Sequence, residues 1–247
     1  MKDAGKAAAE LLDMCKEWIK PGVSSDEIDA KFHEAVVKRG VYPSPLGYAG
    51  FPKSLCVSIN EVVCHGIPDL GAVLQPGDLV KCDVSIYLNG VHGDTCRTFI
   101  AGGSGSTDKE SLRLTAVTKH ALDSAIRICG PGAKISAIGE VIEHIVEASG
   151  FSAVREYSGH GIGEHLHCHP LVSNFKNRNH MVMNEGMTFT IEPMIVEGSP
   201  SIGLWSDGWT VVTVDNKRAA QFEHTVLITA NGAEVLTSYP GSNEPFQ

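Results

Sequence analysis

The segment LVKCDVSIYLNGVHGDTCRTFI, residues 79–100, contains two strand-like runs on either side of an Asn-Gly dipeptide at 89–90. Asn-Gly is the strongest short-range signal for a two-residue hairpin turn, so the segment is predicted to form two antiparallel strands. In that register Asp94 lies opposite Ser85, and Asp83 is two residues along the same strand from Ser85. The two aspartates are then diagonal neighbours on one face of the hairpin.

The predicted hairpin brings these two carboxylates close enough to act together. Diagonal neighbours across a strand pair have Cβ atoms roughly 7 Å apart. Carboxylates at that separation can hold two metal ions, which lie about 3.5–4 Å apart in two-metal sites. A solvated hairpin face is the alternative, but Asp is depleted in strands, and both residues fall amid apolar residues and cysteines. The pattern favours a metal site, while a structural role stays open for either carboxylate alone.

A repeated segment extends the prediction to the whole chain. PGVSSDEIDAKFHEAVVKRGV, starting at residue 21, and PGAKISAIGEVIEHIVEASGF, starting at residue 131, both open with Pro-Gly and close with Gly and an apolar residue. Their apolar positions match at intervals of four residues, as on one face of a helix. A helical segment is predicted before each copy, at about 3–20 and 111–129. The offset of 110 residues indicates two related halves, each with two helices followed by strands.

Two later segments are predicted to contribute further strands and carboxylates. MTFTIEPMIV at 187–196 alternates apolar and polar residues, and WTVVTVDNKRAAQFEHTVLIT at 209–229 is predicted to be another hairpin. The repeat offset places the partner of Asp83 within one residue of Glu192, so these two are predicted to face each other across a pseudo-twofold axis. Glu223 lies in an otherwise apolar strand, where an unpaired charge is costly, so a partner or a metal is expected beside it.

A cluster of histidines lies between these strands. YSGHGIGEHLHCHP at 157–170 places four of them within ten residues, namely His160, His165, His167 and His169. So dense a cluster indicates a metal site, but a metal rarely takes four ligands from one such run. The residues alone do not decide which histidine is a ligand.

The bulk composition excludes several classes of function. The chain has 247 residues, of which 43% are hydrophobic and 20% charged, as is ordinary for a globular protein. A net charge of −9 gives no positive field for nucleic acid or an anionic membrane. No apolar run reaches the length of about 18 residues that a transmembrane helix needs, and the charged N-terminus is unlike a signal peptide. Seven scattered cysteines without a CxxC motif indicate reduced thiols, so a cytoplasmic protein is expected.

Together these motifs resemble those of type I methionine aminopeptidases, metallopeptidases of the pita-bread fold. The matching stretches are FPKSLCVSINEVVCHGIP at 51–68, the 79–100 hairpin, REYSGHGIG at 155–163, MTFTIEPM at 187–194, DGWT at 207–210 and QFEHT at 221–225. The resemblance covers nearly the whole chain. It implies an α+β fold with two pseudo-symmetric halves, about 1–105 and 106–247, whose helices cover a curved, mostly antiparallel sheet. The whole chain, 1–247, would form a single catalytic domain.

The resemblance also implies a role for each site residue. The implied metal ligands are Asp83, Asp94, His160, Glu192 and Glu223. The implied catalytic residues are His65, His167 and Glu192. The implied substrate-binding residues are Tyr48, Phe51, Cys56, His65, Leu166, His167 and Trp209. Within the metal site, Asp94 and Glu223 would bridge two ions, Asp83 would bind one of them, and the other two ligands would bind the second.

The implied activity is removal of the N-terminal methionine from nascent proteins and peptides, with a small second residue favoured. Four carboxylates and one imidazole form an oxygen-rich set that suits two divalent ions of Co, Mn, Fe or Zn. Two such cations lower the pKa of a bridging water, and the resulting hydroxide would attack the first peptide bond. His167 would stabilise the oxyanion, His65 would lie near the scissile nitrogen, and Glu192 would pass a proton to the leaving amine. The expected partners are nascent chains and, transiently, the ribosome, with the enzyme as a monomer.

The sequence departs from the family pattern around the methionine pocket. Leu166 stands where the family usually has Phe, and Pro45 stands where Cys is frequent. His165 and His169 also stand where the family usually has other residues. These departures leave the implied metal ligands unchanged, but they leave the shape of the pocket open.

Three other functions are weighed against this one. A proline-specific dipeptidase or aminopeptidase of the same fold would use the same ligands, but it normally carries a large additional N-terminal domain. A non-catalytic binding protein of this fold would normally have lost metal ligands, and all five counterparts are present here. A structural zinc knot built on Cys168 and the alternating histidines around it would need further closing ligands.

Overall fold

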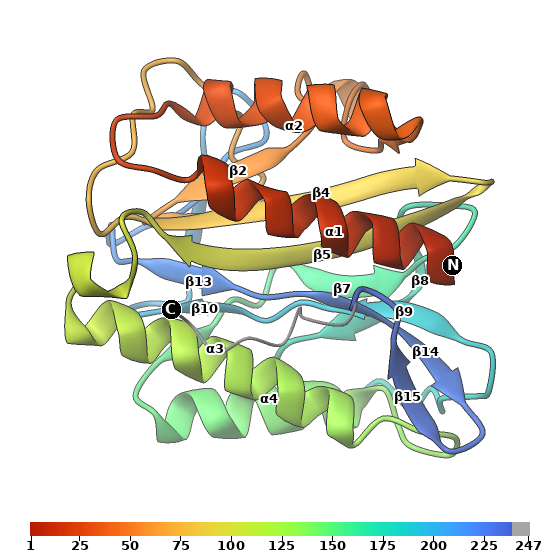
Figure 1. Ribbon diagram of the computed structural model, residues 1–247. Coiled ribbons are helices and arrows are strands. Elements are labelled where there is room, and N and C mark those ends of the chain that lie inside the picture. Colours follow the sequence, from red (N-terminus) through yellow and green to blue (C-terminus); the bar gives the residue numbers. More distant parts are fainter. Residues whose placement is uncertain (239–247) are drawn as a thin grey trace.

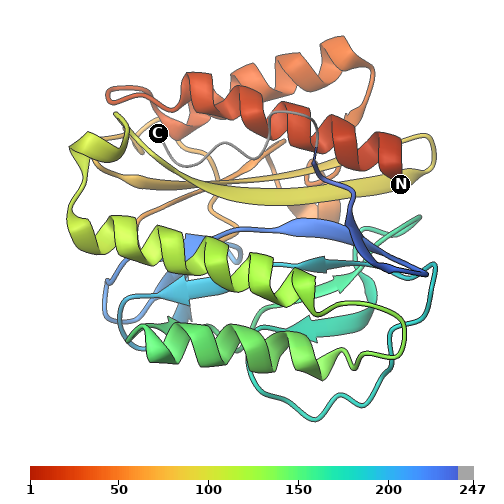
Figure 2. The same ribbon diagram turned by 60° about the horizontal axis from the view of Figure 1, so that its bottom comes forward.

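The computed structural model describes residues 1–238, and in them two helices followed by strands occur twice. The helices are α1 (Lys2–Trp18), α2 (Ser25–Arg39), α3 (Lys109–Arg127) and α4 (Ser136–Ala148). The helices predicted at 3–20 and 111–129 therefore form, with ends shifted by one or two residues. Figure 1 shows α1 beside β4 and β5, and α3 and α4 along the bottom of the view, where α3 contacts β13 and β10. Figure 2 shows that the helices lie side by side in pairs, α1 with α2 and α3 with α4.

The strands form four sheets, and every strand pairing within residues 1–238 is antiparallel. The strands are β1 (Tyr42–Pro43), β2 (Cys56–Ile59), β3 (Val62–Cys64), β4 (Leu79–Leu88), β5 (Val91–Ile100), β6 (Ser152–Ala153), β7 (Ser158–Gly161), β8 (Cys168–Ser173), β9 (Thr188–Ile191), β10 (Met194–Val196), β11 (Ile202–Leu204), β12 (Val211–Thr213), β13 (Ala219–Gln221), β14 (His224–Thr229) and β15 (Gly232–Val235). One sheet has the order β1-β4-β2 with β5 on β4, and the largest has the order β15-β14-β9-β7-β8. The predicted α+β class with antiparallel strands is confirmed.

The hairpin at 79–100 forms in the predicted register. Asn89 and Gly90 have φ angles of 52° and 86°, so both turn residues adopt the left-handed conformation that a type I′ turn requires. Ser85 pairs with Asp94 across β4 and β5. The local turn chemistry was therefore sufficient to determine which residues face each other.

The prediction of a hairpin at 209–229 is wrong. Its first run forms β12, which pairs with β11 and β3, whereas its second run forms β13 and β14 in two other sheets. Apolar alternation identifies a strand but not its partner, and here distant segments supply the partners. The strand predicted at 187–196 is also divided, into β9 and β10, because Pro193 has no N–H to donate to a ladder.

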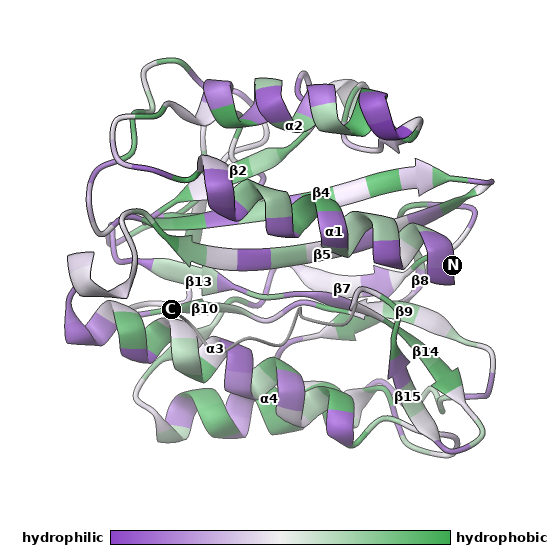
Figure 3. Cartoon of the chain, in the orientation of Figure 1, coloured by the Kyte–Doolittle hydropathy of each residue, from purple (hydrophilic) through white to green (hydrophobic). Residues whose placement is uncertain are grey.

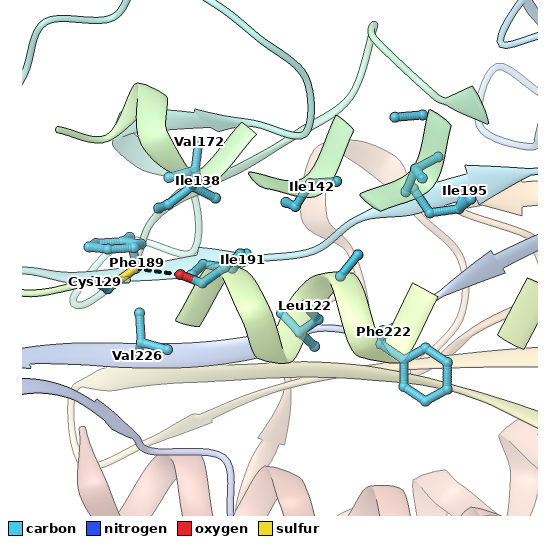
Figure 4. Close-up of a cluster of buried hydrophobic side chains, with 14 of the residues drawn as sticks. Leu122, Cys129, Ile138, Ile142, Val172, Phe189, Ile191, Ile195, Phe222 and Val226 are labelled. Carbon is cyan, nitrogen blue, oxygen red and sulfur yellow. Dashed lines mark hydrogen bonds between the residues drawn. The ribbon is translucent and has the colours of Figure 1, made fainter. Parts of the chain in front are cut away.

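Each pair of helices covers its own hydrophobic core. The matched apolar positions of the repeat are all fully buried, and they are Ile28 and Ile138, Phe32 and Ile142, and Val36 and Val146. The alternating colours of the helices in Figure 3 show their hydrophilic and hydrophobic faces. Figure 4 shows the second core, where Leu122 of α3 and Ile142 of α4 lie near Ile191 of β9. None of the helices within residues 1–238 combines the length and apolar character needed to cross a membrane.

Threonine side chains join the two halves where β5 meets β13 and β14. The Thr98 hydroxyl donates to the carbonyl of Gln221 at 2.8 Å and accepts from its N–H at 2.9 Å. The Thr95 hydroxyl donates to the carbonyl of Glu223 at 2.8 Å, and the Glu223 N–H donates to the carbonyl of Cys96 at 2.9 Å. This seam holds the middle of β5 beside the segment that carries Glu223.

A buried lysine, which the sequence analysis did not single out, forms a second link between the halves. Lys81 on β4 is 1% exposed, and its Nζ donates to the carbonyls of Asn60 and Ala219, each at 2.9 Å. Burial lowers the pKa of this ammonium to about 7. The lysine therefore ties the turn between β2 and β3 to β13 in the second half.

Candidate metal centre and substrate pocket

Four carboxylates enter the centre of the molecule from strands of both halves. Asp83 and Asp94 lie on β4 and β5, Glu192 directly follows β9, and Glu223 lies between β13 and β14. Asp94, Glu192 and Glu223 are buried, and Asp83 is partly buried. Desolvation raises the pKa of all four carboxyl groups, with a further contribution from neighbouring carboxylates for Asp83, Glu192 and Glu223. The strands thus concentrate negative charge in a desolvated space.

His160 on β7 turns an unprotonated nitrogen toward these carboxylates. Its Nδ1 lies 3.1 Å from the carbonyl oxygen of Gly161, and because a carbonyl only accepts, Nδ1 carries the proton. Burial lowers the pKa of His160 to about 4, so the ring is neutral at pH 7. Its Nε2 therefore presents a lone pair, at 3.4 Å from Glu192 Oε1 and 3.7 Å from Asp94 Oδ2. In each contact a nitrogen lone pair of the neutral ring faces a carboxylate oxygen that also only accepts, so neither contact is an ion pair.

This arrangement fits a divalent cation. Asp94, His160 and Glu223 are buried, and each offers a ligand atom within 4.8 Å of the others. Oδ1 of Asp83 is buried and has no hydrogen-bond partner among residues 1–238. Buried lone pairs and carboxylates without donors are costly unless a positive charge lies among them. One imidazole nitrogen and several carboxylate oxygens are ligands typical of first-row divalent metals.

Hydroxyl groups that the sequence analysis missed orient these side chains. The Thr190 hydroxyl donates to Glu192 Oε1 at 2.9 Å and accepts from the backbone N–H of His160 at 2.9 Å. The Ser85 hydroxyl donates to Asp94 Oδ1 at 2.8 Å. Ser85 was predicted opposite Asp94, and Thr190 is two residues from Glu192. Alternation along the strands could therefore have indicated that each hydroxyl lies on the same face as its carboxylate. Such partners fix the orientation of metal ligands in proteins.

The second histidine predicted to act at the site, His167, lies against the first. The ring centroids of His160 and His167 are 4.3 Å apart. The Nδ1 atom of His167 lies 2.7 Å from the hydroxyl of Tyr48, a residue 119 positions away in the sequence. Desolvation and the neighbouring His160 lower the pKa of His167. The structure thus brings together one expected catalytic residue, one expected ligand and one expected pocket residue.

The third predicted histidine, His65, lies among aromatic rings. Its backbone has a φ of 54°, in the left-handed region, directly after β3. Its ring centroid is 5.2 Å from that of Tyr157 and 6.1 Å from that of Trp209. Phe51 packs edge-on against Trp209 at 5.2 Å, and burial lowers the pKa of His65 to about 4. Tyr157 was not among the predicted site residues, although it lies within the REYSGHGIG motif.

Comparison with known proteins decides the family. Residues 1–230 match metallopeptidase family M24. The chain belongs to metallopeptidase family M24. The expected resemblance to methionine aminopeptidases and the expected pita-bread fold are also confirmed. Because members of M24 are metallopeptidases, a divalent metal ion is expected in this chain.

Relatives of this M24 chain resemble it over nearly its full length. Methionine aminopeptidase 1D, chloroplastic/mitochondrial, of Arabidopsis thaliana is 48% identical over 96% of the chain and 67% of its own length. The methionine aminopeptidase of Buchnera aphidicola subsp. Schizaphis graminum is 46% identical over 96% of the chain and 90% of its own length. The crystal structure of methionine aminopeptidase from Rickettsia prowazekii superposes with a TM-score of 0.92 at 42% identity, covering 96% of this chain and 95% of that one.

A prolidase of the same fold is more distant. The prolidase from Pyrococcus furiosus superposes with a TM-score of 0.76 at 23% identity. The match covers 96% of this M24 chain and 62% of the prolidase chain. This likeness shows the shared fold alone.

The remaining predicted positions in the M24 chain differ in burial. Cys56 on β2 is buried and pairs in register with Asp83. Leu166 is buried. His165 and His169 are exposed, and residues 164–167 form no regular strand, so the alternation of these histidines does not place them on one strand face. Within residues 1–238, Cys168 belongs to no group of converging metal-binding side chains, which argues against a zinc knot.

Replacing Gly159, which precedes His160 on β7, is expected to disturb the M24 site. A Cβ at this position would lie 2.4 Å from the carbonyl oxygen of Thr190 on β9. We therefore expect Gly159→Ala to separate β7 from β9, lower the free energy of unfolding by about 1–3 kcal/mol and weaken metal binding. Urea unfolding and metal titration provide the measurements. Gly163→Ala is the control, because its Cβ would meet no atom of the described part of the chain within 4 Å. Equal behaviour of the two variants would contradict this prediction.

Proposed function

We propose that this chain is a methionine aminopeptidase, a metal-dependent exopeptidase that removes the N-terminal methionine from nascent proteins and peptides when the second residue is small. The observation that carries this proposal is the convergence of the ligand atoms of Asp94, His160 and Glu223 within 4.8 Å. Sequence similarity supports the proposal as well. This chain is 46% identical to the methionine aminopeptidase of Buchnera aphidicola, and the match covers 90% of that relative's length. A single catalytic domain would comprise both halves, because each half supplies carboxylates to the centre.

The metal centre in this proposal is dinuclear. The ligands would be Asp83, Asp94, His160, Glu192 and Glu223, and the ions would be Co, Mn, Fe or Zn. When bound, such ions lower the pKa of water and supply a nucleophile at neutral pH. The buried, unpartnered Oδ1 of Asp83 and the bare Nε2 of His160 support this assignment, since both groups need a positive charge beside them.

The side chains around the centre would perform the remaining chemistry. His167 would donate a hydrogen bond to the carbonyl oxygen of the scissile peptide as negative charge develops on it. His65 would lie near the scissile nitrogen, where its low pKa keeps the ring neutral. Glu192 would pass a proton to the departing amine. The hydroxyl of Thr190, which donates to Glu192, would hold that carboxylate in place.

The methionine side chain would bind beside the aromatic group. Phe51 and Trp209 meet edge to face, and Cys56 lies next to Asp83 in the strand register. Aromatic rings and a thiol suit a flexible, polarizable thioether. Tyr48 and the buried Leu166 would complete the pocket, and Leu166 would give a non-aromatic wall.

The biological setting in the proposal follows from the expected substrate. Nascent polypeptide N-termini would be presented during transient contact with the ribosome, and the enzyme would act as a monomer. A cytoplasmic location is supported by the seven cysteines, all of which are free thiols. The net charge of −9 is unfavourable for binding nucleic acid or an anionic membrane surface.

Peptide hydrolysis after metal removal tests the proposed function. The chain is treated with chelator, reloaded stepwise with Mn(II) or Co(II), and assayed with Met-Gly-Met, Met-Phe-Met and Ala-Pro. We expect metal-dependent release of methionine from Met-Gly-Met, slower release from Met-Phe-Met and no cleavage of Ala-Pro. Cleavage of Ala-Pro alone would instead support a proline-specific enzyme. A reloaded protein that binds metal but leaves all three peptides intact would support a non-catalytic binding protein.

A further inference from the structure

Two adjacent histidines in the site have different partners at the same ring atom. Nδ1 of His160 faces the carbonyl oxygen of Gly161 at 3.1 Å, and Nδ1 of His167 faces the hydroxyl of Tyr48 at 2.7 Å. A carbonyl can only accept a hydrogen bond, whereas a hydroxyl can donate one. A carbonyl partner therefore keeps the proton on Nδ1, whereas a hydroxyl partner allows either tautomer and, when it donates, leaves the proton of a neutral imidazole on Nε2.

We propose that Tyr48 is a positioning residue that sets the tautomer of His167. Its hydroxyl donates to Nδ1, so the single proton of the neutral ring lies on Nε2. His167 then presents an N–H donor to the peptide carbonyl, while His160, 4.3 Å away between ring centroids, presents a lone pair. This inference rests on the proposed function and adds to it the reason why two neighbouring histidines act differently.

The opposite tautomer would be harmful at this position. With the proton on Nδ1, Nε2 of His167 would carry a bare lone pair, in a ring whose centroid lies 4.3 Å from that of the proposed ligand His160. That lone pair would compete for the metal and could not donate to a developing oxyanion. A hydroxyl that donates to Nδ1 disfavours this state, and the Tyr48 hydroxyl lies 2.7 Å from that atom.

The loop that carries Tyr48 is held by backbone hydrogen bonds. The Tyr48 N–H donates to the carbonyl of Pro45 at 2.9 Å, and the N–H of Phe51 donates to the carbonyl of Tyr48 at 2.9 Å. The tyrosine ring is tilted by 59° against His167 at 5.1 Å between centroids. Because the backbone and the ring contact do not depend on the hydroxyl, Tyr48→Phe removes the hydrogen bond and keeps the pocket wall.

The experiment compares Tyr48→Phe with Tyr42→Phe in the full-length chain. Tyr42 is the matched control, because its hydroxyl donates to the carbonyl of Leu46 in the same region and does not contact His167. Long-range ¹H–¹⁵N spectra distinguish the two imidazole tautomers, and His167→Ala assigns the signals of this ring. We expect the Nε2–H form in the parent and in Tyr42→Phe, and a substantial Nδ1–H population in Tyr48→Phe.

Kinetics with Met-Gly-Met provide the second measurement. Complete loss of an oxyanion donor costs about 10²–10³-fold in kcat, and a partial loss of the correct tautomer is expected to cost about tenfold. The KM should change little, because the ring of Tyr48 stays in place. An Nδ1–H tautomer in the parent, an unchanged tautomer in Tyr48→Phe, or an unchanged kcat would each overturn the inference. The two proposals can fail separately. If Tyr48→Phe changes the tautomer as expected but the parent cleaves no peptide, the proposed function fails and the assignment of the hydrogen bond stands.

Discussion

His160→Ala is expected to abolish tight metal binding, whereas His167→Ala is expected to retain the metal and lose turnover. The Nε2 lone pair of His160 faces Asp94 and Glu192, so its removal takes away the one nitrogen among the five proposed ligands. We expect metal affinity to fall by more than about 100-fold, since even loss of an indirect partner of a ligand costs about 10–100-fold. For His167→Ala we expect kcat to fall about 10²–10³-fold, as for other lost oxyanion donors.

Calorimetric metal titration of chelator-treated protein and steady-state kinetics measure these effects separately. His165→Ala is the control, because His165 belongs to the same histidine-rich segment but, unlike His167, its side chain makes no hydrogen bond or ring contact with the residues that the structure describes. It should change neither metal affinity nor kcat appreciably. Loss of metal in His167→Ala, or full metal affinity in His160→Ala, would reverse the assigned roles of the two rings.

Asp83→Asn is expected to stabilise the metal-free chain while weakening its affinity for metal. Desolvation, and secondarily the charge of Asp94, raises the pKa of Asp83, and its Oδ1 has no hydrogen-bond partner. An amide has nearly the same shape but no charge, so it removes repulsion that only a bound cation would compensate. We expect a gain of at least about 1 kcal/mol without metal, which raises Tm by roughly 2–4 °C in a chain of this size.

The same carboxylates predict how the stability of the metal-free chain depends on pH. Their folded pKa values are raised above the ordinary carboxyl range near about 4, so the folded state binds more protons than the unfolded state above that pH. Their stabilising contribution is fully present below about pH 4 and is lost as pH rises through the folded pKa values. Added Mn(II) should offset that loss at pH 7, because a ligand that binds only the folded state stabilises it.

Thermal unfolding with chelator and with Mn(II), at a series of pH values, tests both statements. When metal-free, Asp83→Asn should gain Tm relative to the parent as the pH rises above about 4, because only the parent carries the Asp83 carboxyl whose stabilising contribution is lost. With Mn(II) the order should reverse, and the parent should be the more stable protein. A metal-free Asp83→Asn that is less stable than the parent would show that the carboxylate is satisfied without a cation.

Local signals in the sequence were sufficient for part of the candidate site. The turn at 89–90 placed Asp94 opposite Ser85, and the structure has that pairing. The repeat offset related Asp83 to Glu192, and both carboxylates come to the centre from strands of different halves. The resemblance to the aminopeptidase family was needed to separate His160 from its neighbours, because four histidines in one run carry no local signal of function.

The limits of sequence reasoning appear where strands must choose partners. The runs within 209–229 were recognised as strands, but β12 pairs with β3 and β13 with β10. Alternation is a property of one strand, while pairing depends on the closure of long loops and on the fit of a whole core. Lys81 was missed for the same reason, since its two carbonyl partners lie in segments that meet only after folding.

The sequence by itself determined the helices, the register of the first hairpin and the likeness of the two halves, because these depend on turn chemistry and on periodicity within short segments. Only the tertiary structure decided which atoms meet. It placed the hydroxyl of Tyr48 at Nδ1 of His167, across 119 residues of chain, and the carbonyl of Gly161 at Nδ1 of His160. The tautomer of a neutral histidine depends on the hydrogen bonds that its ring nitrogens make. The partner atoms are brought there by packing, and the pattern of the sequence does not identify them.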